Sequence, residues 1–138
     1  IQKKENRLLR EIIEQEGVDG FLDVENQVNS GIEAERTVIA TGGSAVYGRE
    51  AMKHFREIGT IIYLRLPFEK LRERLGNLRG RGVVLKENQS LRDIFEERSV
   101  LYQQYADVII DEENKDIEST LREILNFCLQ LAVDELIL

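Results

Sequence analysis

The stretch "TVIATGGSAVYGREA", from Thr37 to Ala51, decides how this chain is interpreted. A β-branched, apolar run gives way to two glycines and a serine, and a helical pattern begins a few residues later. Because "TVIAT" is short, apolar and bounded by turn residues, it predicts a buried strand. The glycines that follow either form an ordinary tight turn or let a ligand reach main-chain N–H groups. The glycine pair alone favours the ordinary turn, because isolated glycine motifs are weak signals.

The rest of the chain alternates helical patterns with two further apolar runs, "TIIYLRL" at 60–66 and "DVIID" at 107–111. Helices are expected over residues 1–16, 19–30, 49–57, 67–76, 90–106 and 116–131. Continuous apolar strands between helices predict an α/β fold, with a parallel sheet covered by helices on both faces in three layers. Ligands gather at the carboxyl ends of such strands. No linker or repeat divides the sequence, so residues 1–138 are expected to form a single domain.

Composition narrows the class of protein. The chain has 138 residues and a formal net charge of −7, which argues against a general binder of nucleic acid or of anionic membranes. No apolar run approaches the length that crosses a bilayer. The single cysteine, Cys128, cannot form an internal disulfide, which fits a reducing cytoplasm. Its place in an amphipathic helix predicts a buried thiol.

Three further residues are candidates for chemistry, each with a plainer alternative. In the loop of about residues 77–90, Arg81 lies among glycines, where it could close over a polyphosphate or could be solvated. Arg98 lies in mid-helix among acidic residues, so an ion pair within the helix is its alternative. For Glu25, helical periodicity does not settle which face of its helix it occupies.

The order of the motifs adds a family resemblance. "EGVDGF", "VIATGG", "GTIIYLRLPFEKLRERLG", an Arg-Gly lid and "LRDIFEERSVLYQQYADVIID" follow one another along the chain. Together they resemble the shikimate kinases, which have the nucleoside-monophosphate-kinase-like P-loop fold, over essentially the whole sequence. The resemblance implies a Mg²⁺-dependent enzyme that transfers the γ-phosphoryl group of ATP to a ring hydroxyl of shikimate, giving shikimate 3-phosphate.

The resemblance also implies roles for residues on the acceptor side. Gly42, Gly43 and Ser44 match the family's turn whose backbone contacts the shikimate ring, with Gly43 central. Arg98, in "ERSVLY", matches the arginine that binds the shikimate carboxylate. Glu25 keeps an acidic position of the acceptor site.

On the nucleotide side, the resemblance implies three further residues. Arg81 matches the lid arginine that lies over the ATP phosphates and stabilises the transferring group. Arg74 matches an arginine that packs against adenine, and Lys115 falls in the adenine-loop region. No metal ligand is expected from this chain, because the family's Mg²⁺ ligands belong mainly to a segment that the sequence lacks.

Two departures affect the acceptor. Leu22 stands where the family has a second arginine for the carboxylate, and losing such a contact costs roughly 2–5 kcal/mol if nothing replaces it. Ser44 stands where the family has glycine. Either another side chain assists Arg98, or the acceptor is a different small hydroxy acid.

A larger departure is that the sequence contains no GxxGxGK[ST] loop and no Asp-x-Asp motif, which in the family follow its first two strands. We therefore expect the chain as printed to be inactive alone. The first of those strands lies between the "TVIAT" and "TIIYLRL" strands in the family, so its absence leaves a gap. We expect a longer native protein, a neighbouring chain that supplies the strand by self-association of a normally monomeric protein, or a sheet with altered pairing.

Two other classes of function stay open from the residues. One is a non-catalytic, kinase-derived binding or regulatory module that keeps the acceptor pocket. The other is a purely structural chain, whose apolar tail "LQLAVDELIL", at 129–138, packs on a partner.

Overall fold

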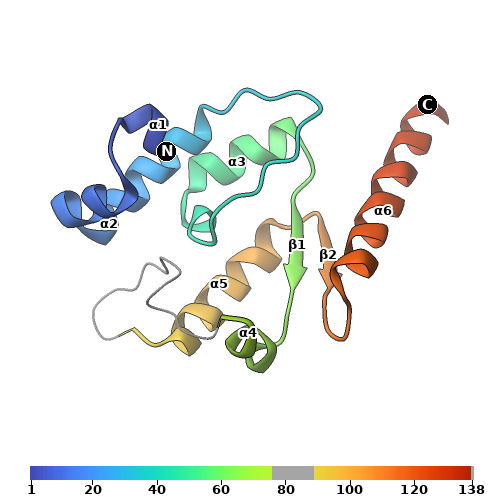
Figure 1. Cartoon of the computed structure of the whole chain (residues 1–138). Helices are drawn as coiled ribbons and strands as arrows, with labels where there is room; N and C mark the ends of the chain where they lie inside the picture. The colour runs from blue at the N-terminus through green and yellow to red at the C-terminus, as the bar shows by residue number, and fades with distance from the viewer. Residues whose placement is uncertain (76–88, 138) are drawn as a thin grey trace.

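The computed structural model describes residues 1–75 and 89–137 (Figure 1). Its elements follow the alternation that the sequence predicts. In chain order they are α1 (Gln2–Glu5), α2 (Leu9–Ser30), a one-turn 3₁₀ helix η1 (Ala45–Tyr47), α3 (Arg49–Ile58), β1 (Ile62–Arg65), α4 (Phe68–Leu75), α5 (Leu91–Tyr105), β2 (Val108–Asp111) and α6 (Ile117–Ile137).

The two strands form a parallel pair, as expected for an α/β fold. Ile62 pairs with Val108, and the register continues to Arg65 opposite Asp111. In Figure 1 the strands stand between α5 on one side and α6 on the other. Because the strands are parallel, Arg65 and Asp111 bring the loops that follow them to the same edge of the sheet.

The segment from Thr37 to Thr41 is not a strand, and the prediction that it forms one is wrong for this structure. It runs as an extended connection between α2 and α3 (Figure 1), and Val38 is 94% exposed. Within the described residues, the main chain of 38–41 makes no hydrogen bond. An apolar, β-branched sequence becomes a strand only when a neighbouring strand accepts its main-chain groups, and here none lies alongside.

Helix boundaries agree with the capping signals. Ser90 starts α5 through a capping box, in which Ser90 Oγ accepts from the Asp93 N–H at 3.2 Å and Asp93 Oδ2 accepts from the Ser90 N–H at 2.8 Å. Ser90 Oγ also donates to Asp93 Oδ2 at 2.6 Å, and this bond, followed by the one from the Ser90 N–H, lowers the pKa of Asp93. Gly17 has φ 73°, which favours glycine, and it kinks α2 where the sequence predicts two helical segments.

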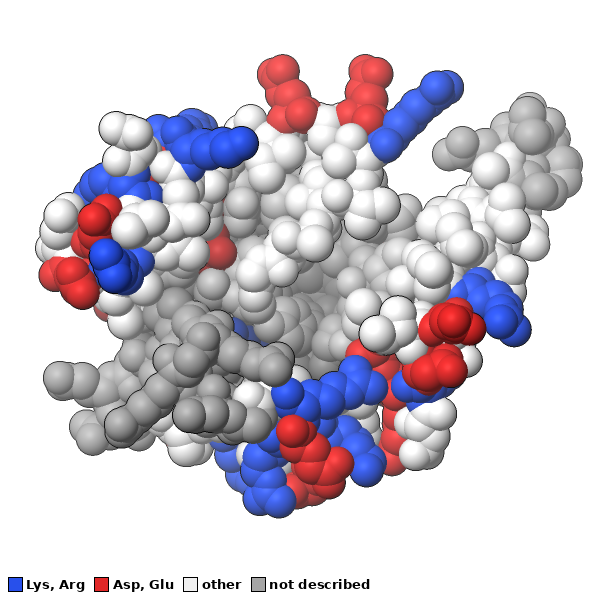
Figure 2. Space-filling view, viewed as in Figure 1, with Lys and Arg blue, Asp and Glu red and all other residues white. Residues whose placement is uncertain are grey.

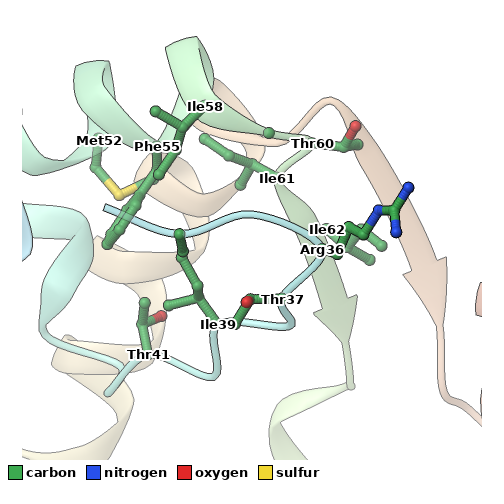
Figure 3. Close-up of a pocket in the computed structure, with 12 residues that line it drawn as sticks. Arg36, Thr37, Ile39, Thr41, Met52, Phe55, Ile58, Thr60, Ile61 and Ile62 are labelled. Carbon is green, nitrogen blue, oxygen red and sulfur yellow. The ribbon is translucent and has the colours of Figure 1, made fainter. Parts of the chain in front are cut away.

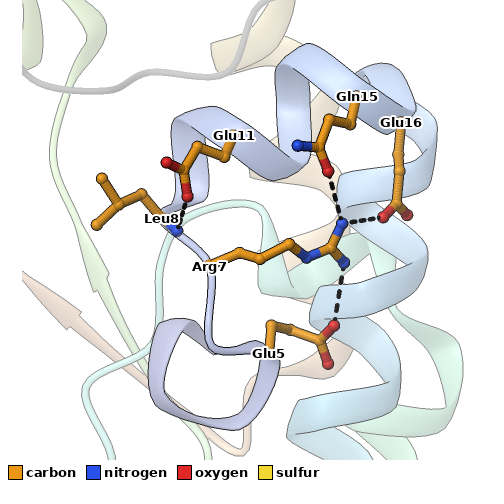
Figure 4. A network of polar contacts seen from close by, with 6 residues as sticks. All are labelled: Glu5, Arg7, Leu8, Glu11, Gln15 and Glu16. Atoms are coloured by element: carbon orange, nitrogen blue, oxygen red, sulfur yellow. Dashed lines mark hydrogen bonds and ion pairs between the residues drawn. The ribbon is translucent and has the colours of Figure 1, made fainter.

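The N-terminal helix is tied to α2 by one arginine (Figure 4). Arg7 Nη1 donates to Glu16 Oε1 at 2.6 Å and to Gln15 Oε1 at 3.0 Å, while Nη2 donates to Glu5 Oε2 at 3.1 Å. The hydrogen bonds to Glu16 and Glu5 raise the pKa of Arg7. The network fixes the chain's entry into α2, the helix that carries Glu25.

The core centres on α3. Ala51, Met52 and Phe55 are buried there. Ile32, just after α2, Ile61, just before β1, and Tyr105, at the end of α5, pack against them. The outer helix α6 is less covered: Cys128 is exposed, so the prediction of a buried thiol is wrong. Within the described residues no element covers that face, and Ile117, Leu121, Leu125 and Leu129 are also exposed. None of the described helices is both long and apolar enough to span a membrane.

Candidate functional site

The glycine turn is the centre of the candidate acceptor site. Gly42 and Gly43 are exposed, whereas Ser44 is buried, and the turn closes through a 3.2 Å bond from the Ala45 N–H to the Gly42 carbonyl. A Cβ added at Gly43 would lie 3.0 Å from Tyr102 Oη and 3.1 Å from Arg98 Nη1. Glycine at position 43 therefore lets two side chains of α5 approach the main chain closely.

Tyr102 holds this turn against α5. Its hydroxyl donates to the Gly43 carbonyl at 2.7 Å, and its ring lies 5.0 Å from the ring of Tyr63 on β1. Burial raises the pKa of Tyr102, so the phenol stays protonated and able to donate. No motif in the sequence indicated Tyr102, although its spacing of four residues from Arg98 places both on one helix face.

Arg98 lies beside the turn, where it contacts the side chain of Tyr47. Its Nε donates to Tyr47 Oη at 3.4 Å, and the guanidinium carbon is 5.3 Å from the centre of the Tyr47 ring. On the same helix Arg92 pairs with Glu69 and Glu96, whereas none of the ion pairs among the described residues includes Arg98. The alternative of an ion pair within the helix is therefore not what the described residues form.

Glu25 faces inward toward the same turn, which settles the question that periodicity leaves open. The residue is 4% exposed, and its Oε1 would lie 3.4 Å from a Cβ added at Gly42. Oε2 is buried and has no hydrogen-bond partner within the described residues. Burial raises the pKa of Glu25, and a hydrogen bond with Ser44 and the charge of Arg98 act against that rise. A buried carboxyl, a cation and an open turn thus meet at one place.

Leu22, which stands where the family has an arginine, lies near this site. Leu22 lies in a surface depression formed by α2 and the end of η1, together with Asp19, Asp23, Asn26, Tyr47 and Gly48. Asp19 and Asp23 are exposed. Tyr47 therefore touches Arg98 on one side and borders the depression of Leu22 on the other, a link that no sequence signal indicated.

The candidate nucleotide residues lie elsewhere, at the carboxyl ends of the strands. Arg74, near the end of α4, bonds Glu112 Oε2 at 3.0 Å, and Lys115, in the loop after β2, pairs with Glu123. The Lys115 N–H also donates to the Glu112 carbonyl at 3.2 Å, so Arg74 and Lys115 meet through Glu112. In Figure 2 basic and acidic side chains lie side by side along the lower edge of the molecule, where Figure 1 places α4.

The structure does not test two other predictions about the nucleotide site, the role of Arg81 and the source of the Mg²⁺ ligands. Arg81 lies outside the described residues, as does most of the expected lid of about residues 77–90. In the part of the chain that is described, no group of three or more His, Cys, Asp or Glu residues is placed to hold a metal ion. The source of any Mg²⁺ ligands therefore stays a prediction.

A cavity of about 220 Å³ lies between the extended segment and β1 (Figure 3). One wall is the segment, through Thr37, Ile39 and Thr41, and the other comes from α3 and the start of β1. The carbonyls of Ile61 and Arg65 accept from residues 107, 108 and 112 on the β2 side. Main-chain groups alternate along a parallel strand, so those of Ile62 and Leu64 point to the opposite side, toward the segment.

Comparison with known proteins agrees with the motifs. The family model for shikimate kinase matches residues 1–129. A shikimate kinase of Persephonella marina is 30% identical over 126 residues, which cover 91% of this chain and 76% of that protein. A shikimate kinase of Aquifex aeolicus is 31% identical over 126 residues, with 91% and 74% covered.

Among solved structures, a shikimate kinase from Acinetobacter baumannii in complex with shikimate superposes with a TM-score of 0.71 at 29% identity. The superposition covers 97% of this chain and 74% of that one. Sequence, motif order and fold thus lead to one conclusion: the chain belongs to the shikimate kinase family.

Proposed function

We propose that this chain binds shikimate at the Gly42–Ser44 turn and serves the ATP-dependent phosphorylation of a ring hydroxyl, which gives shikimate 3-phosphate. The observation that supports this most directly is the position of Arg98. Its guanidinium, free of any ion pair within the described residues, lies against a turn whose glycine 43 carries no side chain. A cation beside open main chain suits a small ring that carries a carboxylate and hydroxyls.

On the acceptor side, Arg98 binds the carboxylate, because a guanidinium offers forked donors to two carboxylate oxygens. Gly42, Gly43 and Ser44 contact the ring through the main chain. Glu25 lies behind the turn and holds it through Ser44. The solved relative from Acinetobacter baumannii, which carries shikimate, supports this choice of acceptor.

On the nucleotide side, ATP occupies the carboxyl ends of the strands. Arg74 packs against adenine and Lys115 lies in the adenine loop, while Arg81 stabilises the charge on the transferring phosphoryl group. Mg²⁺ supplies the charge neutralisation that phosphoryl transfer needs when it is bound with ATP. Residues 1–138 act as one domain in the cytoplasm, with a lid of about residues 77–90.

The experiment is a calorimetric titration of shikimate into the wild-type chain and into Arg98→Ala. Removing a charge-assisted contact costs about 2–5 kcal/mol, so the Kd for shikimate should rise by at least about 30-fold. Arg92→Ala is the matched control, because Arg92 lies on the same helix but pairs with Glu69 and Glu96 away from the turn. It should leave the Kd unchanged.

Activity is then followed as ADP release from ATP, with and without shikimate. The assay compares the chain alone with a version joined at its N-terminus to a segment that carries the GxxGxGK[ST] motif. ADP release that depends on shikimate supports the proposal. An Arg98→Ala variant that binds shikimate as tightly as wild type would contradict it. A non-catalytic binding module would bind shikimate and release no ADP in either version; the comparisons do not favour that alternative.

A further inference from the structure

We infer that Tyr47 is the second donor to the acceptor's carboxylate, acting beside Arg98; this rests on the proposed function. Within the described residues, Arg98 is the only arginine at the turn. The depression next to Tyr47 is lined by Leu22, whose side chain is apolar and cannot bind a carboxylate. A carboxylate held by one guanidinium leaves an oxygen lone pair on the side of Leu22 unbound. Among the described residues, Tyr47 is the polar side chain that both contacts Arg98 and borders the depression.

The hydrogen-bond directions make the phenol available. Arg98 Nε donates to Tyr47 Oη at 3.4 Å, so the oxygen acts as acceptor toward the arginine. A phenol has one proton to donate as well, and no acceptor takes it within the described residues. Contact with a cation also strengthens the phenol as a donor. A carboxylate that accepts from Arg98 can therefore accept from Tyr47 at the same time.

The ring of Tyr47 has a second effect, on the direction of Arg98. The guanidinium carbon lies 5.3 Å from the ring centre, within the range of a cation–π contact. On the other side Arg98 Nη1 lies close to Gly43. The guanidinium is thus held between the ring and the glycine turn, which lowers the entropy cost of binding an anion.

The charges around the depression restrict the class of ligand. Asp19 and Asp23 border it, and Glu25 lies behind the turn. In the described part of the chain, Arg98 is the cation beside the turn. One cation and one neutral phenol suit a single carboxylate. A phosphate dianion would meet greater repulsion from Asp23, which is exposed at the depression. The arrangement thus selects a hydroxylated monocarboxylate over a phosphorylated acceptor.

The test uses Tyr47→Phe, which keeps the ring beside Arg98 and removes only the hydroxyl. Shikimate and its methyl ester are titrated into wild type and Tyr47→Phe. We expect the Kd for shikimate to rise about tenfold, which corresponds to loss of one hydrogen bond to a charged group. The Kd for the methyl ester, which has no carboxylate, should not change. Tyr105→Phe is the control, because Tyr105 packs on the core away from the turn.

A rescue separates a binding role from a structural one. Leu22→Arg in the Tyr47→Phe background places a cation in the depression and should restore shikimate affinity. Equal Kd values for wild type and Tyr47→Phe would overturn the inference, as would an equal loss for the ester. If Arg98→Ala weakens binding while Tyr47→Phe does not, the proposed function stands and only this inference fails. If wild type binds no shikimate, both fail.

Discussion

The turn at Gly42–Ser44 and the segment at Thr37–Thr41 are neighbours in sequence, and they are held in opposite ways. The turn is held by side chains from two helices: Tyr102 donates to the Gly43 carbonyl at 2.7 Å, and the buried carboxyl of Glu25 lies against Gly42. The segment beside it makes no main-chain hydrogen bond at residues 38–41 within the described residues, and a cavity separates it from β1 (Figure 3).

The difference shows what each kind of structure requires. Side-chain contacts between α2, α5 and the turn need only those elements, and all of them are present in the chain. A strand needs a second strand at about 5 Å along its whole length, and at this edge the described residues provide none. The glycine turn is therefore held on both sides by contacts within the described residues, whereas the neighbouring part of the sheet is not.

The largest effect is expected at the core that supports both regions. Phe55 is 8% exposed and lines the cavity from α3, so Phe55→Ala should lower the free energy of unfolding by about 3–5 kcal/mol. Denaturant unfolding followed by circular dichroism measures the change. Ile58→Ala is the matched control, because Ile58 lines the same cavity but is 40% exposed. An equal loss in both variants would mean that the cavity is closed in solution.

A smaller effect, specific to the turn, is expected at Glu25. Burial raises the pKa of its carboxyl in the folded state, so the native protein binds this proton more tightly than the unfolded chain. Its contribution to stability is therefore present below the ordinary pKa of glutamate and is lost as pH rises through the raised value. In Glu25→Gln, which does not titrate, that part of the pH dependence should disappear.

The measurement is the free energy of unfolding of wild type and Glu25→Gln, taken at a series of pH values upward from about pH 4. The difference between the two should shift in favour of the variant as pH rises. Asp93→Asn is a control of opposite sign, because hydrogen bonds to Ser90 lower the pKa of Asp93. Its carboxylate stabilises at higher pH and loses that effect as pH falls. A constant difference for Glu25→Gln would indicate that the carboxyl is solvated.

Much of the fold follows from local signals, because helices are fixed by residues near in sequence. Helices α3 and α5 lie within one residue of the predicted ranges 49–57 and 90–106, and the kink at Gly17 lies between the predicted helices 1–16 and 19–30. The parallel pairing of "TIIYLRL" with "DVIID" also follows from two apolar runs joined by a helical crossover. The strand at "TVIAT" was a wrong prediction, because β-propensity reports that a segment can pair and not that a partner is present.

The candidate site also combines residues that the sequence predicts with residues that only the structure reveals. Gly43, Arg98 and Glu25 were predicted as one site because each lies in a motif that resembles the family. Tyr47 could not be found from the sequence, because its contact with Arg98 joins residues 51 positions apart. Cys128 was placed wrongly because an amphipathic pattern shows which helix face is apolar and not whether another element covers it.

The smallest effect is expected in the extended segment itself. Val38 is 94% exposed, and its main chain has no hydrogen bond within the described residues. Val38→Lys should therefore change the free energy of unfolding by less than about 0.5 kcal/mol and leave the Kd for shikimate unchanged. Ala45→Lys, at a residue 2% exposed on the other side of the turn, is the contrasting variant and should be strongly destabilising. A large loss for Val38→Lys would mean that the segment is paired in solution, with Val38 buried against the strand that pairs with it. The cavity beside β1 would then be filled, and the contrast between the two halves of "TVIATGGS" would disappear.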